Sequence, residues 1–300
     1  MKLSREDIVF DTLKVGFLLL LVFVTLYPFL NVLAVSLNDP QDTVRGGIGI
    51  WPRVFSTISY EEIFFETQNI AVATQNSILR TVISAVVQTF ATAMVAYVLS
   101  RREFVLRIPM SIIYVLTMYI EGGLIPTYFL YRSLGLINTF TVYWLPGLTA
   151  AFNMLVIRTY MRGISESFVE SAKIEGANDF WVFLKVILPL SVPVLATIVL
   201  FIAVFQWNQW WDTFIFNSSA RDLSTLQYEL MKKIQTANAA LSGGSMADAF
   251  SRAQDSSAAE VTPKSIRAAM TIVVSVPIIM IYPFLQRYFV HGLTIGGVKG

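Results

Sequence analysis

The sequence contains no cysteine and a single histidine, His291. Without cysteine the chain can form no disulfide, no Cys-ligated zinc site and no iron–sulfur centre. One histidine argues against a histidine metal site or a His-based catalytic triad, so we expect no metal site and no catalytic residue. Charge is also scarce, because Asp, Glu, Lys and Arg make up 14% of the residues, whereas soluble domains carry about a quarter.

The few charges are nearly balanced, with a formal net charge of +2. Lys and Arg form no long run, which argues against nucleic-acid binding. Apolar residues dominate instead, at 55% of the chain with a mean hydropathy of +0.62. This balance predicts an integral membrane protein.

Long uncharged runs recur along the chain. A helix needs about 20 apolar residues to cross a bilayer. We therefore predict a single all-α transmembrane domain over 1–300. Its six expected spans are about 15–38, 76–100, 108–131, 137–158, 190–211 and 267–288. The first run ends without a small-x-small cleavage pattern, so we expect an uncleaved span and not a signal peptide.

Lys and Arg in the short loops predict the orientation of the chain. They lie before the first span, between spans two and three, between spans four and five, and after the last. The residues are Lys2, Arg5, Lys14, Arg101, Arg102, Arg107, Arg158, Arg162, Lys173, Lys185, Arg287 and Lys299. We expect this side, and both termini, to be cytoplasmic. The loops 39–72 and 212–265 would then be external.

The cytoplasmic segment 163–189 is unusually polar for a membrane protein. Ser167 and Glu170 have the spacing of a capping box that starts a helix. Gly176 supplies a stop for that helix, and Asn178 is suited to cap a second one. An apolar face then follows at helical spacing, with Phe180, Phe183, Leu184 and Ile187. Pro189 and Pro193 should bend the chain as it enters span five. An ordinary pair of interfacial helices is the simpler alternative.

This segment resembles the EAA loop of ABC-importer permeases. The matching residues are Glu170, Ala172, Glu175, Gly176, Ala177, Phe183, Ile187, Leu188 and Pro189. Ser171 and Glu175 stand where the family favours Ala and often Asp. The resemblance implies a coupling helix that docks into an ATP-binding subunit. It assigns that coupling to Glu170, Ser171, Ala172, Glu175, Gly176, Ala177, Phe183 and Pro189, with Glu170 to Gly176 docking and Phe180 to Pro189 transmitting the motion.

Other stretches resemble the MalG-like, carbohydrate-transporting branch of these permeases. They are Leu134 to Thr139 and the C-terminal run from Tyr282 to Gly300. Two more, Ser224 to Leu230 and Val261 to Ala268, resemble a subgroup for complex or acidic oligosaccharides, such as alginate- or uronate-type sugars.

The resemblance implies a set of partners in a bacterial cytoplasmic (inner) membrane. They are a second, MalF-like permease, two ATP-binding subunits, an extracytoplasmic solute-binding protein and a carbohydrate substrate. The sequence has no G-x-x-x-x-G-K-[ST] motif. We therefore expect no cofactor in this chain, which would not be an enzyme, and we expect ATP and Mg on the partner subunits.

Trp207, Asn208 and Glu121 are candidates for the substrate path. Aromatic faces beside amides suit sugar rings, although Trp residues also anchor helices at the headgroups. Glu121 would be an acid inside a span; its alternatives are a structural bond to a neighbouring helix or a break at Gly122-Gly123. Arg80 should mark the outer end of span two and snorkel there.

The second external loop resembles, by position, the loop through which MalG-like permeases contact the binding protein. Its candidate contact residues are Ser242, Gly243, Gly244 and Ser245. A solvated loop without a specific role is the alternative.

For the whole protein, the alternative of an ABC permease for another solute remains open. A secondary transporter or channel would need several ionisable groups at mid-membrane, and only Glu121 qualifies.

Overall fold

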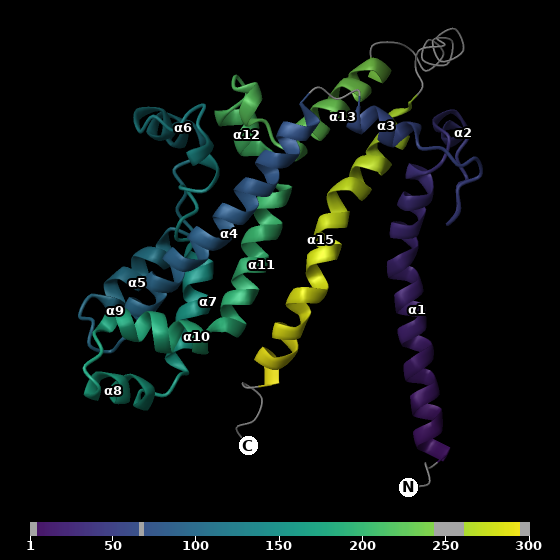
Figure 1. Ribbon diagram of the computed structural model, residues 1–300. Coiled ribbons are helices and arrows are strands. Elements are labelled where there is room, and N and C mark those ends of the chain that lie inside the picture. Colours follow the sequence, from purple (N-terminus) through teal and green to yellow (C-terminus); the bar gives the residue numbers. More distant parts are fainter. Residues whose placement is uncertain (1–4, 66–68, 243–260, 295–300) are drawn as a thin grey trace. The chain divides into compact units, whose positions relative to one another are not determined.

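The computed structural model describes residues 5–65, 69–242 and 261–294, which are mostly helical (Figure 1). The helices are α1 (Arg5–Ser36), α2 (Pro40–Val44), α3 (Ile58–Phe64), α4 (Ile70–Ser100), α5 (Arg107–Leu116), α6 (Leu124–Ser133), η1 (Phe140–Tyr143), α7 (Ala151–Arg162), α8 (Ser167–Ile174), α9 (Asp179–Val182), η2 (Phe183–Ile187), α10 (Leu188–Leu190), α11 (Val192–Asn208), α12 (Trp211–Phe216), η3 (Arg221–Leu223), α13 (Leu226–Ser242) and α15 (Pro263–Thr294). The predicted all-α class is confirmed.

Within the residues that the structure describes, three stretches of helix are long and apolar enough to cross a membrane. They are Val9–Ser36, Ile70–Ser100 and Pro263–Ile281, and they overlap the predicted spans 15–38, 76–100 and 267–288. A fourth candidate is bent: Asp179–Leu190 and Val192–Asn208 meet at 82°. The bend lies at Ser191, between Pro189 and Pro193, as the two prolines predict.

The range 108–131, predicted as the third span, is not one continuous helix. α5 ends at Leu116 and α6 begins at Leu124. Gly123 has a φ of +82°, a conformation that a residue with a Cβ adopts only under strain. Glu121 lies in this break and is exposed. The alternative of a break at Gly122-Gly123 is therefore the one observed.

The range 137–158 is divided in the same way, into η1 and α7 with a turn between them. Gly147 in that turn lies close to Gln88 of α4, because an added Cβ would stand 2.8 Å from the Gln88 Nε2. The same Nε2 donates to the Trp144 carbonyl at 2.8 Å. A side chain of α4 thus provides the hydrogen-bond donor for a backbone carbonyl of this turn. How many of the six predicted ranges cross the bilayer stays a prediction.

The chain divides into two compact units, one formed by 1–70 and 230–276 and the other by 71–229 and 277–300. In the first unit, Asn38 organises the polar turn after α1. Its Oδ1 accepts from the backbone N–H groups of Arg53 and Val54 at 2.7 and 3.0 Å. Its Nδ2 donates to Asp42 and Thr43. The apolar side chains of α1 from Val9 to Phe29 are exposed, as expected for a helix that faces lipid or another protein.

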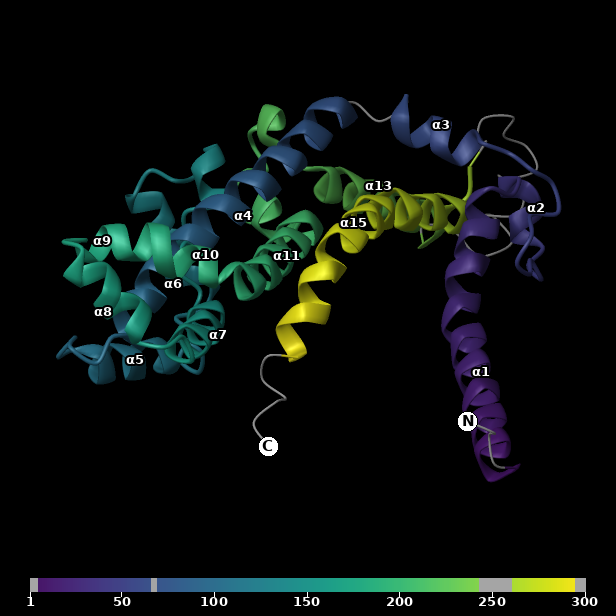
Figure 2. The same ribbon diagram turned by 60° about the horizontal axis from the view of Figure 1, so that its bottom comes forward.

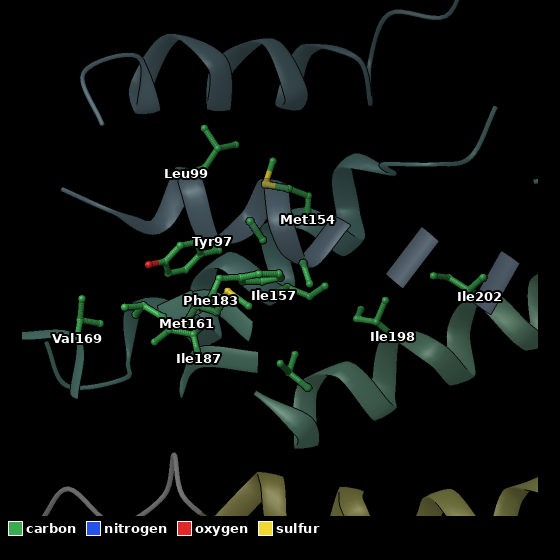
Figure 3. Close-up of a cluster of buried hydrophobic side chains, with 14 of the residues drawn as sticks. Tyr97, Leu99, Met154, Ile157, Met161, Val169, Phe183, Ile187, Ile198 and Ile202 are labelled. Carbon is green, nitrogen blue, oxygen red and sulfur yellow. The ribbon is translucent and has the colours of Figure 1, made fainter. Parts of the chain in front are cut away.

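The second unit has a continuous apolar core built from α4, α7, α8, η2 and α11 (Figure 3). On α7 the buried side chains recur at i, i+3 and i+7, as Met154, Ile157 and Met161. They pack with Phe183 and Ile187 from η2. In both views, α8, α9 and α10 gather at the same end of this unit as α5 and α7 (Figures 1 and 2).

Candidate functional site: the 163–189 elbow and its connections

Segment 163–189 contains a short helix, a glycine turn and a second helix, which we call the elbow. The first helix, α8, does not begin with the predicted capping box. Its N-cap is Glu166, which makes no side-chain cap, and the Ser167 hydroxyl pairs with that of Ser165 at 2.8 Å. The capping-box prediction was wrong because the N-cap lies one residue earlier, so Ser167 is the first helical residue and not the cap.

α8 ends in a Schellman motif at Gly176, whose φ is +86°. The Ala177 N–H donates to the Ala172 carbonyl at 3.0 Å, and the Gly176 N–H donates to the Lys173 carbonyl at 3.0 Å. These are the two bonds that satisfy the last carbonyls of a helix ending in a left-handed residue. The predicted glycine stop is confirmed. The second helix is capped by Asn178, whose Oδ1 accepts from the Trp181 N–H at 2.8 Å, also as predicted.

Lys173 ties the two halves of the elbow together. Its ammonium lies 3.2 Å from an Asp179 carboxylate oxygen and 3.3 Å from Glu103, in the turn after α4. Hydrogen bonds to Asp179 and then Glu103 raise the pKa of Lys173 above its ordinary value. Asp179 also stands in the first turn of α9, where the helix dipole favours a carboxylate. The elbow is therefore held by charge as well as by its backbone turn.

The two faces of α8 differ in character. Val169 and Ala172 are buried in the core, so Ala172 packs inward and is not part of an exposed docking surface. Facing out, besides Ser167 and Lys173, are two acids, one small polar residue and two apolar side chains. These exposed residues are Glu170, Ser171, Glu175, Phe168 at 51% and Ile174 at 87% exposure. Sequence reasoning missed Phe168 and Ile174. Ile174 stands outside the helical repeat of Val169 and Ala172, whereas Phe168, four residues before Ala172, falls within it, so the sequence carried a signal for Ile174 only.

The second half of the elbow is anchored in the core. Phe183 and Ile187 are buried, and the Phe183 ring lies 5.4 Å from the ring of Tyr97 and 5.9 Å from that of Phe90, both on α4. Residues 183–187 form a π-helical turn, a local widening that often occurs at functional sites. Of the residues assigned to coupling, Ala177 is partly buried and Pro189 is exposed.

The three candidates for a substrate path have different surroundings. Trp207 is buried in α11, at 8% exposure. Asn208 is exposed, and its amide donates to the Val204 carbonyl one turn earlier at 2.8 Å. Glu121 lies in the break between α5 and α6.

Of the four predicted contacts with a binding protein, Ser242 is the last residue of α13, and Gly243, Gly244 and Ser245 lie outside the described residues.

Arg80 does not snorkel, which corrects the expectation for this residue. It is 1% exposed, and its guanidinium reaches Asp212 at 2.5 Å and the Gln206 Oε1 at 2.6 Å. It also lies over the Tyr143 ring, 4.4 Å from the centroid. The sequence analysis placed Arg80 at the outer end of the second predicted span, and Asp212 directly follows the fifth predicted span, 190–211. Opposite charges that are each isolated in an apolar sequence are a signal for such a pair.

The chain is similar along its whole length to permease proteins of sugar transport systems. It is 35% identical over 293 residues to the polygalacturonan/rhamnogalacturonan transport system permease protein YtcP of Bacillus subtilis, covering 97% of this chain and 98% of that protein. It is 26% identical over 305 residues to the arabinooligosaccharides transport system permease protein AraQ of Halalkalibacterium halodurans, covering 100% of both. No protein-family model matches the chain.

A solved structure has the same fold. It is a bacterial ABC transporter involved in the import of the acidic polysaccharide alginate. The superposition has a TM-score of 0.79 with 27% sequence identity, and it covers 96% of this chain and 99% of the other. Similarity of this extent in both sequence and fold confirms the resemblance found in the sequence: the chain belongs to the family of carbohydrate ABC-importer permeases.

Proposed function

We propose that the elbow is the surface through which ATP-binding subunits drive this permease. The observation that carries the proposal is the division of the elbow into an exposed face and an anchored half. Phe168, Glu170 and Ile174 face outward on α8, while Phe183 and Ile187 are buried in the core that contains α4, α7 and α11. A force applied to α8 would move that packed core as a block, because close-packed interiors transmit displacement.

The partners follow from this role. The chain would pair with a second permease to form the translocation path, and two ATP-binding subunits would hold ATP and Mg. An extracytoplasmic binding protein would deliver the sugar. ATP binding would then bias the chains between inward- and outward-facing states, which is coupling between a ligand and a distant two-state element. Both termini and the elbow would lie in the cytoplasm of a bacterium.

The docking role is tested on the purified transporter. Ile174→Glu introduces a charge into an apolar contact at a position that is 87% exposed, so the permease itself should fold. Truncation of a central contact residue typically costs a complex 1 kcal/mol or more. We therefore expect retention of the ATP-binding subunit and its stimulated ATP hydrolysis to fall by about fivefold or more.

Val105→Glu is the matched control, since Val105 is 89% exposed in the turn after α4, on the same predicted side. Glu170→Ala should act in the same direction as Ile174→Glu. Equal loss of the ATP-binding subunit in the Ile174 and Val105 variants, or loss in neither, would contradict docking through α8.

We further propose that the substrate is an acidic oligosaccharide. The support is the relatives themselves, since one transports polygalacturonan or rhamnogalacturonan and the solved transporter imports alginate. Calorimetry on the cognate binding protein checks this. An oligogalacturonide or oligoalginate is expected to bind, and neutral arabino- or malto-oligosaccharides of equal length should bind at least tenfold more weakly. Preference for the neutral sugars would reject an acidic substrate while leaving the docking proposal intact.

A further inference from the structure

The α7 helix also lines a groove outside the buried core. Met154, Ile157 and Met161 are buried in the core, whereas Arg158 and Leu155, which packs against the edge of the core, border the groove beside α5. α5 presents Ile108, Ile112 and Leu116 toward the same space. These two helices form the walls of an open groove of about 260 Å³.

The walls of this groove are apolar and accessible. On α5, Ile108, Ile112 and Leu116 recur every four residues, so their side chains lie along one face of the helix. Their exposed fractions are 60%, 54% and 47%. Ser111 also lines the groove, and its hydroxyl donates a hydrogen bond to the Arg107 carbonyl of the same helix. The walls therefore offer an aliphatic ligand contact area and almost no hydrogen bonds.

Positive charge gathers at one end of the groove. Arg158 borders it, Arg107 directly precedes the lining residue Ile108 on α5, and Arg162 lies one helical turn after Arg158 on α7. The Arg158 Nε donates to the Leu99 carbonyl at 3.0 Å, which fixes the head of the side chain. Arg107 is also the first residue of α5, where the positive end of the helix dipole adds to the same field.

No carboxylate within residues 5–65, 69–242 and 261–294 forms an ion pair with Arg107, Arg158 or Arg162. Clustered like charges without counterions repel one another. A second permease covering the groove with an apolar helix would leave this cluster desolvated and unpaired, which is costly. A ligand with a negative head and an aliphatic tail fits both parts of the groove.

We propose that the α5–α7 groove binds an anionic phospholipid of the cytoplasmic leaflet. An acyl chain would lie along Ile108, Ile112 and Leu116, and the headgroup phosphate would lie among Arg107, Arg158 and Arg162. The assignment to the cytoplasmic leaflet rests on the orientation in the proposed function, because these arginines belong to the side predicted to be cytoplasmic. Basic residues at membrane surfaces attract anionic lipid in this way.

The test uses the complete transporter in nanodiscs that contain a phosphatidylglycerol with a photoreactive diazirine on its acyl chain. Matching discs carry the probe as phosphatidylcholine. Labelled peptides are mapped by mass spectrometry. We expect phosphatidylglycerol to label peptides from 107–116 and 151–162 more strongly than phosphatidylcholine does. Arg107→Gln or Arg162→Gln should lower that labelling about fivefold, the ratio that corresponds to about 1 kcal/mol per basic residue.

Two matched controls separate the site from the surface around it. Arg102→Gln removes a charge from the same predicted side, at a residue that is paired with Glu166 at 3.9 Å and does not line the groove; labelling should not change. Ile112→Trp should block the groove and abolish labelling, whereas Ile113→Trp, at a neighbouring residue that is 59% exposed but outside the lining, should not.

Equal labelling by the two lipids, equal effects of Arg107→Gln and Arg102→Gln, or labelling that Ile112→Trp leaves unchanged would each overturn the proposal. So would a bifunctional cross-linker that joins this groove to the partner permease in the same discs. Sugar uptake by the same preparations is measured separately. Normal uptake with equal labelling by the two lipids would reject only the lipid site. Lost uptake with intact preferential labelling by phosphatidylglycerol would count against the proposed function instead.

Discussion

Arg80 shows how a single residue connects distant parts of the chain. Its partners Gln206 and Asp212 come from α11 and α12, and Tyr143 beneath it comes from η1. The Tyr143 hydroxyl donates to the Leu223 carbonyl. The segment that follows α11 is thus attached to α4 through buried polar groups. A buried ion pair is weak evidence for stability, because both charges lose water, but removing one partner leaves the other unpaired.

Replacing Arg80 by Met tests this network. Asp212, which is 17% exposed, and the Gln206 amide would lose their charged partner, so we expect the free energy of unfolding to fall by about 3 kcal/mol. Denaturant titration of the detergent-solubilised chain measures it. Arg132→Met is the control, since Arg132 is exposed on α6. Pairing Arg80→Met with Asp212→Asn should cost less than the sum of the two, and full additivity would show that the ion pair contributes nothing.

At the scale of the element, uncharged length was a reliable guide to the long helices. α1, α4 and α15 occupy the ranges predicted for spans one, two and six, with ends that extend into polar residues. Hydropathy locates the apolar stretch, whereas hydrogen bonding sets the helix ends, and polar residues are tolerated there. The elbow was predictable for a different reason: Gly176 and Asn178 act on their own backbone within a few residues.

The breaks in the other predicted spans depend on contacts that hydropathy does not contain. Gly147 lies against Gln88, which is 59 positions earlier in the numbering, and Gln88 satisfies the Trp144 carbonyl in the turn. The inward packing of Ala172 and the burial of Arg80 have the same origin, since each is decided by a neighbouring helix. The local part of the site could therefore be predicted from the sequence, and the part made by tertiary contacts could not.

At the scale of the whole molecule, every proposed role depends on which side of the membrane each segment faces. Docking of α8 and a lipid headgroup among Arg107, Arg158 and Arg162 both require a cytoplasmic location, and contact with a binding protein requires the opposite one. The excess of Lys and Arg in the loops of one side predicts this arrangement. The same charges also provide the basic end of the α5–α7 groove, so orientation and lipid binding would share a cause.

The absence of cysteine makes the orientation directly measurable, because one introduced thiol is the only one in the chain. Ile174→Cys in α8 and Trp51→Cys in the loop predicted to be the first external one are suitable, since these side chains are 87% and 78% exposed. A membrane-impermeant maleimide should label Trp51→Cys in intact spheroplasts and Ile174→Cys only in inside-out vesicles. Val105→Cys should follow Ile174→Cys. Labelling of Ile174→Cys from the outside would reverse the topology, and α8 would then be inaccessible to any cytoplasmic ATP-binding subunit.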